Sequence, residues 1–392
     1  MIKKTNTLIP EIRFPEFIND GDWEEKKLNK LGNLINGLTY SPNDVREKGL
    51  LVLRSSNVQN GQIVLNDTVY VMPEIKGANL TQAEDILVCI RNGSKTLIGK
   101  NAIIPKDIPL ATHGAFMTVF RAEHPKFVFQ LFQTVAYSKQ VNADLGATIN
   151  SINGKNFLKY KFIVPKPREQ QKIASCLSSL DNIIAAQGQK LGALQEHKKG
   201  LMQNLFPQEG ETIPKYRFPE FVNDNDWVEK TFEELFIIGN GRDYKHLDKG
   251  KIPVYGSGGR MRFVNDYLYD GESACIGRKG TIDKPMFLSG KFWTVDTLFY
   301  THSFKDCLPK FIYYIFQNIN WIKHNEAGGV PSLSKTNIYK IATYIPKPRE
   351  QQKLVDCISS LDILIKTQEE KMEQLKLHKK GLMQGIFPQI ND

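Results

Sequence analysis

Two long stretches of the chain place apolar residues at alternating four- and three-residue intervals, which is the seven-residue period of a coiled coil. The seam positions of the first stretch are Ile173, Leu177, Leu180, Ile184, Gln187, Leu191, Leu194, Lys198, Leu201 and Leu205. The second stretch keeps the same phase at Leu354, Ile358, Leu361, Ile365, Gln368, Met372, Leu375, Lys379, Leu382 and Ile386. A seven-residue period held this long predicts two helices, each with one seam that supercoils left-handedly with a partner.

Each helix is expected to begin at a proline, Pro167 or Pro348, because the first helical turn tolerates proline. Each is expected to end before a Phe-Pro-Gln segment that contains Pro207 or Pro388. At ~1.5 Å per residue, helices of this extent would be roughly 55–60 Å long.

Polar residues interrupt the two seams at matching places, Gln187 with Gln368 and Lys198 with Lys379. Polar seam residues lower the stability of a coiled coil but can fix its register. We interpret these polar residues as residues that fix the alignment of the two helices. The alternative, that they are merely solvated ends of the seams, applies more readily to the lysines than to the glutamines.

The helical stretches belong to a repeated scaffold. Residues 165–208 and 346–389 align without gaps and share 27 of 44 residues, including PKPREQQK at the start of each copy. A shorter repeat precedes each insert, because IPEIRFPEFINDGDW at Ile9–Trp23 resembles IPKYRFPEFVNDNDW at Ile213–Trp227. The chain therefore uses one scaffold twice, around two inserts that differ in length and sequence.

The two helices of one chain most simply pair with each other. The connection between them contains the whole second insert, so parallel and antiparallel pairing are both sterically possible. Antiparallel pairing is favoured, because equivalent repeats then make equivalent contacts around a pseudo-two-fold axis.

The inserts, about Glu24–Val164 and Val228–Ile345, alternate short apolar runs with Asn- and Gly-containing turns, which indicates β-rich domains with embedded helices. They also share landmarks. Matching strands are expected around Cys89 and Cys275 and around Thr112 and Thr294, and Ser151 and Ser332 precede the PKP joints. We interpret the inserts as diverged copies of one domain type and the two cysteines as core residues. The predicted fold class is α+β, with segments 1–164, 165–208, 209–345 and 346–392 as domain, helix, domain and helix.

Length and composition agree with a multidomain globular protein. The chain has 392 residues, too many for one ordinary core, with 41% hydrophobic and 24% charged residues. Its five cysteines are scattered without a C-x-x-C pair, which favours the reducing cytoplasm over a disulfide framework or structural zinc. No apolar run is long enough to span a membrane. The net charge of +10 makes a polyanion partner plausible, although solubility alone would also explain it.

Motifs for catalysis and cofactor binding are missing from the sequence. The segment RNGSKT lacks the glycines of a Walker A loop, and YGSGG lacks the last glycine of a dinucleotide fingerprint. The seven histidines have no metal-ligand spacing, and neither NPP[FY] nor DPP[FY], the signature of amino-methyltransferases, is present. We therefore expect a non-catalytic chain with no cofactor and no metal of its own.

Residue types that contact bases and phosphates are concentrated in turns of the inserts. Arginine can bind guanine and asparagine can bind adenine through two hydrogen bonds each, and backbone amides of glycine turns suit phosphates. The presence of equivalent basic turns in both copies favours a role of these turns in binding DNA. The candidates in the first insert are Arg54, Ser55, Ser56, Asn57, Arg91, Asn92, Ser94, Lys95, Thr112 and His113. The candidates in the second are Tyr255, Ser257, Arg260, Arg262, Arg278, Lys279 and Thr281.

Taken together, these patterns resemble the specificity (S) subunits of bacterial type I restriction–modification systems over essentially the whole chain. The most specific matches are the doubled P-K-P-x-E-Q-Q-K joint, SSLD, HKKGLMQ and the RFPEF lead-ins, with GSGGR, IGRKGTI, FWTVDT and PSLSK in the second insert. The resemblance implies that each insert is a target recognition domain binding one half of an asymmetric, bipartite site on double-stranded DNA. It further implies that the helices set the gap between the half-sites and dock two methyltransferase subunits, which translocase/endonuclease subunits join.

The same resemblance assigns S-adenosylmethionine, ATP and Mg to those partner subunits. Two alternatives remain open from the residues alone. One is a coiled-coil adaptor that binds protein without DNA specificity, and the other is a stand-alone DNA-modifying enzyme.

Overall fold

The computed structural model describes residues 9–145 and 150–388, which divide into two compact units. Unit 1 consists of the chain up to Gln187 together with the part from Lys371 onward, and unit 2 of Gly188–Glu370. The predicted domain limits at residues 1 and 392 lie outside the described residues. Each unit is α+β, which confirms the predicted fold class.

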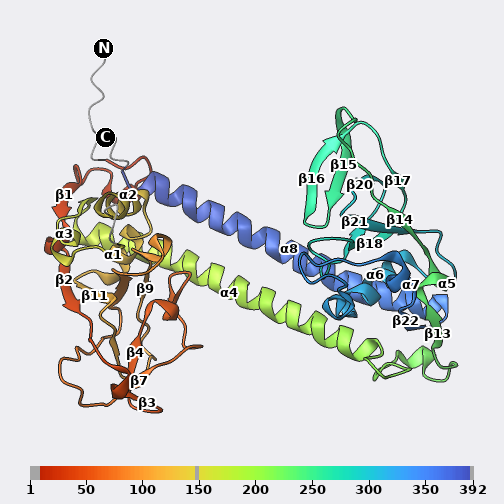
Figure 1. Cartoon of the computed structure of the whole chain (residues 1–392). Coiled ribbons are helices and arrows are strands. Elements are labelled where there is room, and N and C mark those ends of the chain that lie inside the picture. The colour runs from red at the N-terminus through yellow and green to blue at the C-terminus, as the bar shows by residue number, and fades with distance from the viewer. Residues whose placement is uncertain (1–8, 146–149, 389–392) are drawn as a thin grey trace. The chain divides into compact units, whose positions relative to one another are not determined.

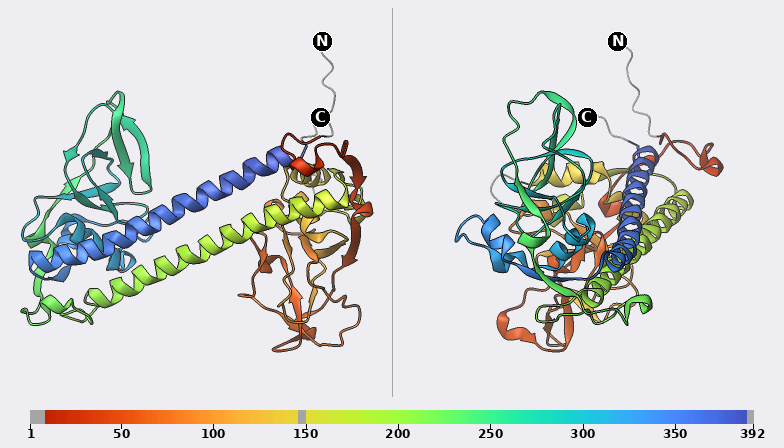
Figure 2. Two further views of the ribbon diagram at one scale, coloured as in Figure 1. Left: turned by 180° about the vertical axis from the view of Figure 1, so that it is seen from behind. Right: turned by 90° about the vertical axis from the view of Figure 1, so that its right-hand side faces the viewer.

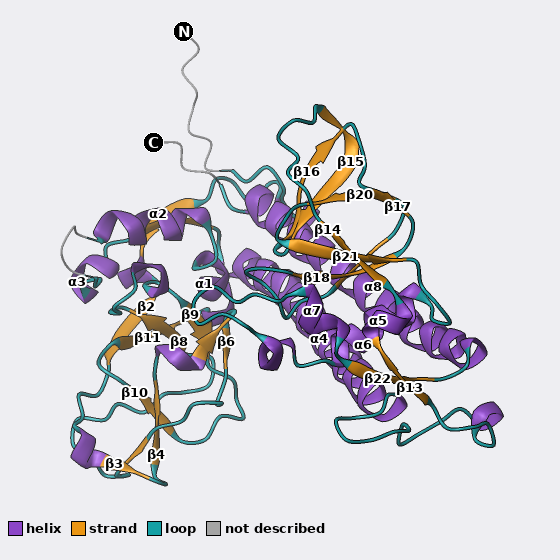
Figure 3. Cartoon of the chain, turned by 45° about the vertical axis from the view of Figure 1, so that its right-hand side comes forward, coloured by secondary structure: helices purple, strands orange, loops and turns teal. Residues whose placement is uncertain are grey.

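Unit 1 is built in layers, with α1–α3, then one four-stranded sheet, then a second sheet on the far side (Figures 1 and 3). The first sheet has the order β2-β11-β8-β9, from Gly32–Asn36, Met117–Ala122, Ile86–Cys89 and Asn101–Ile103. The second has the order β10-β4-β7-β3, from Ala111–His113, Leu50–Leu53, Tyr70–Val71 and Val45–Arg46. Two-stranded ladders join β1 (Glu24–Lys27) to β12 (Lys161–Val164) and β5 (Val58–Gln59) to β6 (Gln62–Ile63). The helices are α1 (Pro125–Leu131), α2 (Val135–Asp144) and α3 (Gly154–Phe157).

Unit 2 repeats this plan. Its first sheet has the order β14-β21-β18-β19, from Ile237–Asn240, Leu298–His302, Ser273–Gly277 and Met286–Leu288. Its second has the order β16-β15-β20-β17, from Gly259–Val264, Lys249–Gly256, Lys291–Thr294 and Tyr269–Asp270. The ladder of β13 (Val228–Thr231) with β22 (Ala342–Ile345) corresponds to that of β1 with β12. The helices are α5 (Phe232–Leu235), α6 (Pro309–Asn318) and α7 (Lys335–Tyr339), and the β15–β16 hairpin projects from the unit (Figure 2).

Backbone hydrogen bonds define which residues of the two units are equivalent. The parallel pair of β4 with β10 corresponds to that of β15 with β20, so that His113 is equivalent to Thr294. After this pair the amides of Gly114 and Val295 donate to equivalent carbonyls, of Leu53 and Tyr255. The inserts are thus diverged copies of one fold, as predicted.

Register corrects two details of that comparison. Cys89 and Cys275 lie in matching strands and are fully buried, as predicted, but Cys89 pairs with Met117 where Gly277 pairs with Leu298, so Cys89 is equivalent to Gly277. Thr112 and Thr294 also lie in matching strands, one position apart in register.

The two long helices are α4 (Pro167–Leu205) and α8 (Pro348–Ile386), each of 39 residues. Both begin at the predicted proline and end before the predicted Phe-Pro segment. Within unit 1 the start of α4 shares a core with the end of α8, through Leu177 and Ile386 among others. Within unit 2 the end of α4 shares a core with the start of α8, which contributes Ile358. The helix segments of each unit therefore run antiparallel, while a coiled coil along the whole seam stays a prediction.

The PKPREQQK joint is held by a buried ion pair with the short repeat of its own unit. The Arg13 guanidinium donates from Nε and Nη2 to Glu169 at 2.8 and 2.7 Å, and Arg217 donates to Glu350 at 2.7 Å twice. Glu169 and Glu350 are each 1% exposed. The joint motif predicts that both its arginines and its glutamates fix the junction. The glutamates do so, but Arg168 and Arg349 are exposed on the helix surface. The arginines that fix the joint come instead from the lead-in repeats.

Candidate nucleic-acid interface

In each unit two of the predicted basic turns meet. In unit 1 the turn after β4 is tied to the turn after β8, because Asn92 Nδ2 donates to Ser55 Oγ at 3.1 Å. In unit 2 the turn after β15 is tied to the turn after β18, because Ser257 Oγ donates to the carbonyl of Lys279 at 2.8 Å. Ser55 and Ser257 are equivalent, because each lies two residues after the strand residue, Leu53 or Tyr255, that pairs with the parallel strand. The sequence-predicted turns therefore form one basic site in each unit.

The segment that precedes each joint holds the basic turn through its backbone. In unit 1 the Asn92 amide donates to Asn150 at 3.3 Å, and Arg91 forms a bridge with Ser151. In unit 2 the Gly280 amide donates to Pro331 at 2.8 Å, and Lys279 forms a bridge with Ser332. These contacts make Arg91 equivalent to Lys279 and confirm the predicted match of Ser151 with Ser332.

Gly280 is required by the turn in unit 2. Its φ of +88° lies in the left-handed region, and a Cβ there would lie 3.3 Å from Ser257 Oγ. A side chain at this position would therefore strain the backbone and press on the serine that ties the two turns together.

Unit 2 places two cations on one aromatic ring. The Arg278 guanidinium lies 5.9 Å from the Phe299 ring centroid, and Lys335 Nζ lies 5.9 Å from the same centroid. Lys335 Nζ also donates to the carbonyl of Ile238 at 2.6 Å. Partial burial, and then the neighbouring Arg278 charge, lower the pKa of Lys335. The segment PSLSK stands out in the sequence, but Lys335 itself is missing from the predicted contact residues, because only the fold brings α7 beside β21.

A groove of about 740 Å³ lies beside this site in unit 2, between the β15–β16 hairpin and the loop after β20. Its lining includes Lys245, Ser257 and Arg260, together with the carboxylates of Asp243 and Asp296. Arg260 and Arg262 lie over the rings of Phe263 and Tyr244, at 5.3 and 5.5 Å from the centroids. Among the described residues no carboxylate lies within ion-pair distance of Arg260, Arg262, Arg278 or Lys279, so these cations are available to an anionic ligand.

Unit 1 presents fewer available cations. Arg54 is paired with Asp67 at 2.7 Å, and hydrogen bonds from Ser56 and Arg54 lower the pKa of that carboxyl. Arg91 lies over Phe116 at 5.8 Å from the ring centroid, and Phe116 is 56% exposed. Arg91 and Lys95 are exposed on the basic turn, as is Ser94, which shares a 2.8 Å hydrogen bond with Thr96. Arg54 thus stabilises its loop, while Arg91 and Phe116 form an exposed cation–aromatic pair.

Three predicted contact residues lie inside unit 1, and the prediction was wrong for them. Asn57, Thr112 and His113 are each 0% exposed. Asn57 Nδ2 donates to Val64 and Asp67, Thr112 Oγ1 donates to Asn79, and His113 Nε2 donates to Ile35, all to backbone carbonyls at 2.8–3.0 Å. Burial lowers the pKa of His113. Because their polar groups are used internally, these side chains stabilise the sheets and loops and do not reach a ligand.

Two candidates of unit 2 are only half-buried. Tyr255 packs against the cluster of Cys275 and Phe292, and Thr281 lies at the end of the basic turn. The other predicted contact residues are exposed or half-buried and stay predictions: Arg54, Ser55, Ser56, Arg91, Asn92, Ser94, Lys95, Tyr255, Ser257, Arg260, Arg262, Arg278, Lys279 and Thr281. To these the structure adds Lys335.

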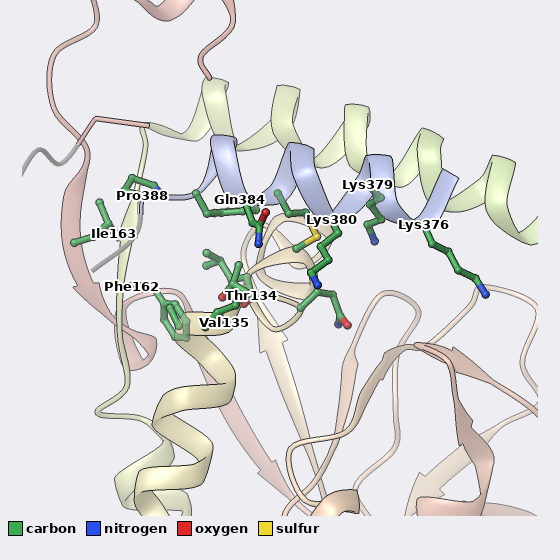
Figure 4. Close-up of a pocket in the computed structure, with 14 residues that line it drawn as sticks. Thr134, Val135, Phe162, Ile163, Lys376, Lys379, Lys380, Gln384 and Pro388 are labelled. Carbon is green, nitrogen blue, oxygen red and sulfur yellow. Dashed lines mark hydrogen bonds between the residues drawn. The ribbon is translucent and has the colours of Figure 1, made fainter. Parts of the chain in front are cut away.

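Unit 1 has a hollow of about 340 Å³ at the end of α8 (Figure 4). Its lining includes Thr134 and Val135 from the start of α2 and Lys376, Lys379 and Lys380 from α8. An equivalent hollow of about 530 Å³ in unit 2 is lined by Phe206 and Pro207, which match Phe387 and Pro388 of unit 1. Both hollows lie where a domain meets the end of a long helix and are distinct from the basic turns.

Within residues 9–145 and 150–388, no cluster of three or more His, Cys, Asp or Glu side chains could hold a metal ion. In the same ranges no helix is both long and apolar enough to cross a membrane.

The arrangement of two sheets, a basic turn and a long helix, present twice in one chain, is that of a two-domain DNA specificity protein. The model of the type I restriction modification DNA specificity domain matches the chain twice, over residues 20–196 and 224–377. The chain therefore belongs to the type I restriction–modification DNA specificity family, which confirms the resemblance stated from its sequence.

Relatives and solved structures agree with this assignment. A Methanocaldococcus jannaschii protein assigned as the type I restriction enzyme MjaX specificity subunit is 26% identical over 396 residues, covering 92% of each chain. The EcoKI specificity subunit of Escherichia coli is 29% identical over 170 residues, covering 40% of this chain and 36% of that protein. The crystal structure of the type I S subunit from M. genitalium has a TM-score of 0.69 and 16% identity, covering 98% of this chain and all of that one, which shows a shared fold.

Proposed function

We propose that this chain is the non-catalytic subunit that sets the DNA sequence specificity of a type I restriction–modification complex. Each unit binds one half of an asymmetric, bipartite target in double-stranded DNA. The observation that carries the proposal is that both copies of the fold have an equivalent basic turn. In each copy an equivalent serine, Ser55 or Ser257, connects this turn to a second turn, and an equivalent segment before the joint holds it in place.

Different side chains at equivalent positions explain why the two half-sites would differ. Lys279 of unit 2 is equivalent to Arg91, and the neighbouring Arg278 is equivalent to Ile90. Arginine reads guanine through two parallel hydrogen bonds, whereas lysine acts as a point charge on phosphates or bases. One fold therefore carries two different contact surfaces.

The long helices set the gap between the half-sites and dock the partner subunits in this proposal. Half-sites on one face of B-DNA lie about one turn apart, ~34–36 Å, which helices of 39 residues can span at ~1.5 Å per residue. Ile183 on α4 and Leu364 on α8 occupy equivalent repeat positions and are 47% and 52% exposed. Two matching apolar positions suit two copies of one methyltransferase subunit, which would bind S-adenosylmethionine. Translocase/endonuclease subunits would join them and use ATP and Mg.

A domain exchange tests the proposal. Residues Glu24–Val164 are replaced by the corresponding insert of a relative with a different target, and the methylated sites of the assembled complex are mapped by sequencing. We expect one half-site to change while the other half and the gap stay the same. The reciprocal exchange of Val228–Ile345 is the matched control and should change only the other half. A change in both halves, or in neither, would refute the assignment, and methyl transfer by the isolated chain would refute its non-catalytic role.

A further inference from the structure

The sequence motif SSLD occurs once in each long helix, and its aspartate is a meeting point of three elements. In unit 2 the Asp362 carboxylate on α8 receives Lys198 from α4 on one oxygen, with Nζ at 2.7 Å from Oδ1. Its other oxygen, Oδ2, accepts a hydrogen bond from the Tyr314 hydroxyl on α6 at 2.8 Å. One carboxylate thus links both long helices to the helix of the recognition domain.

Unit 1 contains the same arrangement with the helices exchanged. Asp181 on α4 receives Lys379 of α8 on Oδ1 at 2.5 Å, and Gln130 Nε2 on α1 donates to Oδ2 at 2.8 Å. Figure 4 shows Lys379 on the end portion of α8 that lies over this domain. The alternative that the seam lysines are merely solvated ends is wrong, because their side chains are only 15–17% exposed and are paired.

The domain residues that complete the two clusters are structurally equivalent but chemically different. Helices α1 and α6 both begin with Pro-Lys-Phe, and Gln130 and Tyr314 are each the sixth residue of their helix. Both side chains are fully buried. The two long helices therefore contain the same Asp–Lys pair twice, and each domain donates a hydrogen bond to its aspartate from a different residue, Gln130 or Tyr314.

The domain side of the unit 2 cluster is packed into a core and makes further hydrogen bonds to the long helices. Tyr314 lies in the core of unit 2 together with Phe311 and Phe316, and its hydroxyl also lies 3.0 Å from Ser359 Oγ on α8. Lys198 also contacts α6 directly, because its Nζ donates to Gln317 Oε1 at 3.1 Å. A change in the angle between α6 and the long helices would break these directional bonds together.

We propose that the Asp181–Lys379–Gln130 and Asp362–Lys198–Tyr314 clusters fix the orientation of each recognition domain on its helix pair, and thereby set how strictly the complex discriminates the gap length of its target. The inference rests on the proposed function. The residues are positioning residues, since they touch the helices and not the basic turns. Loosening a cluster leaves base recognition within a half-site unchanged but lets the domain tilt, so targets with a wrong gap are accepted more readily.

The test uses the full complex with its methyltransferase subunits and the wild-type target. Methylation rates are measured on duplexes with the native gap and with gaps one base pair longer or shorter, and on duplexes with one altered half-site base. Tyr314→Phe removes only the hydroxyl, and Asp362→Asn removes the charge with little change of shape. Asp356→Asn is the matched control, because Asp356 is exposed on the same helix and, within the described part of the chain, is bonded only to Gln352 of its own helix.

We expect Tyr314→Phe to lower the native-to-wrong-gap ratio by roughly threefold to tenfold, the factor that corresponds to one net hydrogen bond, and Asp362→Asn to lower it further. Discrimination between half-site bases should stay at the wild-type value, and Asp356→Asn should change neither ratio. Melting temperatures identify any variant that fails to fold. Tyr314→Phe should fold, because the loss of one hydroxyl leaves the aromatic core filled.

Two results would overturn the proposal. One is an unchanged gap ratio in folded Tyr314→Phe and Asp362→Asn, with or without a lower melting temperature, since the clusters would then only stabilise the fold. The other is equal loss of gap and base discrimination. A wild-type complex that shows no bipartite target at all would instead refute the proposed function, so the two failures are distinguishable.

Discussion

Replacement of Glu350 by glutamine should destabilise unit 2 strongly, because this carboxylate is the buried centre of the second PKPREQQK joint. Glu350 is 1% exposed and accepts two 2.7 Å hydrogen bonds from the Arg217 guanidinium. The Trp227 indole N–H donates to Glu350 Oε1 at 3.2 Å. The variant Glu350→Gln keeps the shape of the side chain but removes the carboxylate paired with Arg217, whose side chain is 13% exposed. The arginine then keeps only the weaker attraction of Asp224 and Asp226.

The magnitude follows from the ion pair and the hydrogen bonds that the substitution removes. Removing one partner of a buried ion pair costs about 3–5 kcal/mol, because the remaining charge stays desolvated. The glutamine oxygen still accepts one hydrogen bond, which recovers about 1 kcal/mol. We therefore expect the free energy of unfolding of unit 2 to fall by roughly 3 kcal/mol.

Hydrogen-exchange mass spectrometry of core peptides from β18 and α6 measures this loss in unit 2, and peptides from β8 and α1 serve as the internal reference in unit 1. The matched variant Glu169→Gln in unit 1 should cost about 1 kcal/mol less, because among the described residues the Trp23 indole N–H has no acceptor to lose. Arg349→Ala is the exposed control and should change stability by less than about 0.5 kcal/mol. A Glu350→Gln loss as small as that of the control would refute the ion-pair reasoning.

Three further predictions concern DNA binding, partner docking and pH. Replacing both Arg278 and Lys335 by alanine should make DNA binding less sensitive to salt: the slope of log K for DNA binding against log salt concentration should decrease in magnitude by about 0.9 for each phosphate that is no longer neutralised. Lys366→Ala on α8 is the control and should leave the slope unchanged. An unaltered slope in the double variant would contradict a phosphate-binding role. Replacing Ile183 and Leu364 by aspartate should weaken binding of the methyltransferase subunits by more than about tenfold, because burying each apolar side chain stabilises a complex by ~1.5–3 kcal/mol. Thr367→Asp is the control, and an undiminished affinity in titration calorimetry would exclude Ile183 and Leu364 from the interface. Hydrogen bonds from the Thr231 backbone, Lys230 and the Thr231 hydroxyl lower the pKa of Glu234 to about 2. The contribution of Glu234 to stability is therefore present above its ordinary pKa and is lost as the pH falls toward 2, so Glu234→Gln should make the melting temperature depend less on pH between about pH 5 and pH 2. An identical pH profile of the melting temperature in both proteins would show that Glu234 does not contribute.

Repetition and periodicity made the scaffold predictable. A seam kept in one phase over ten positions predicted both long helices, and Pro167 and Pro348 marked their first residues, because proline has a local effect that sequence neighbours cannot override. Two divergent inserts between near-identical repeats likewise predicted two copies of one α+β domain and the family to which the chain belongs. These features depend on residues close together in the sequence or on direct comparison of its two halves.

Burial and long-range pairing were decided only by the tertiary structure. No sequence pattern marks Asn57, Thr112 and His113 as buried, because short strands and turns carry little sign of which face is covered. Arg13 forms an ion pair with Glu169, which is 156 positions away in the sequence, and Lys379 forms one with Asp181, which is 198 positions away. The sequence determines which residues can form such pairs. The attraction between two opposite charges, and the cost of losing one of them, become large only where packing has removed water from around the pair, and only the folded chain shows where that happens.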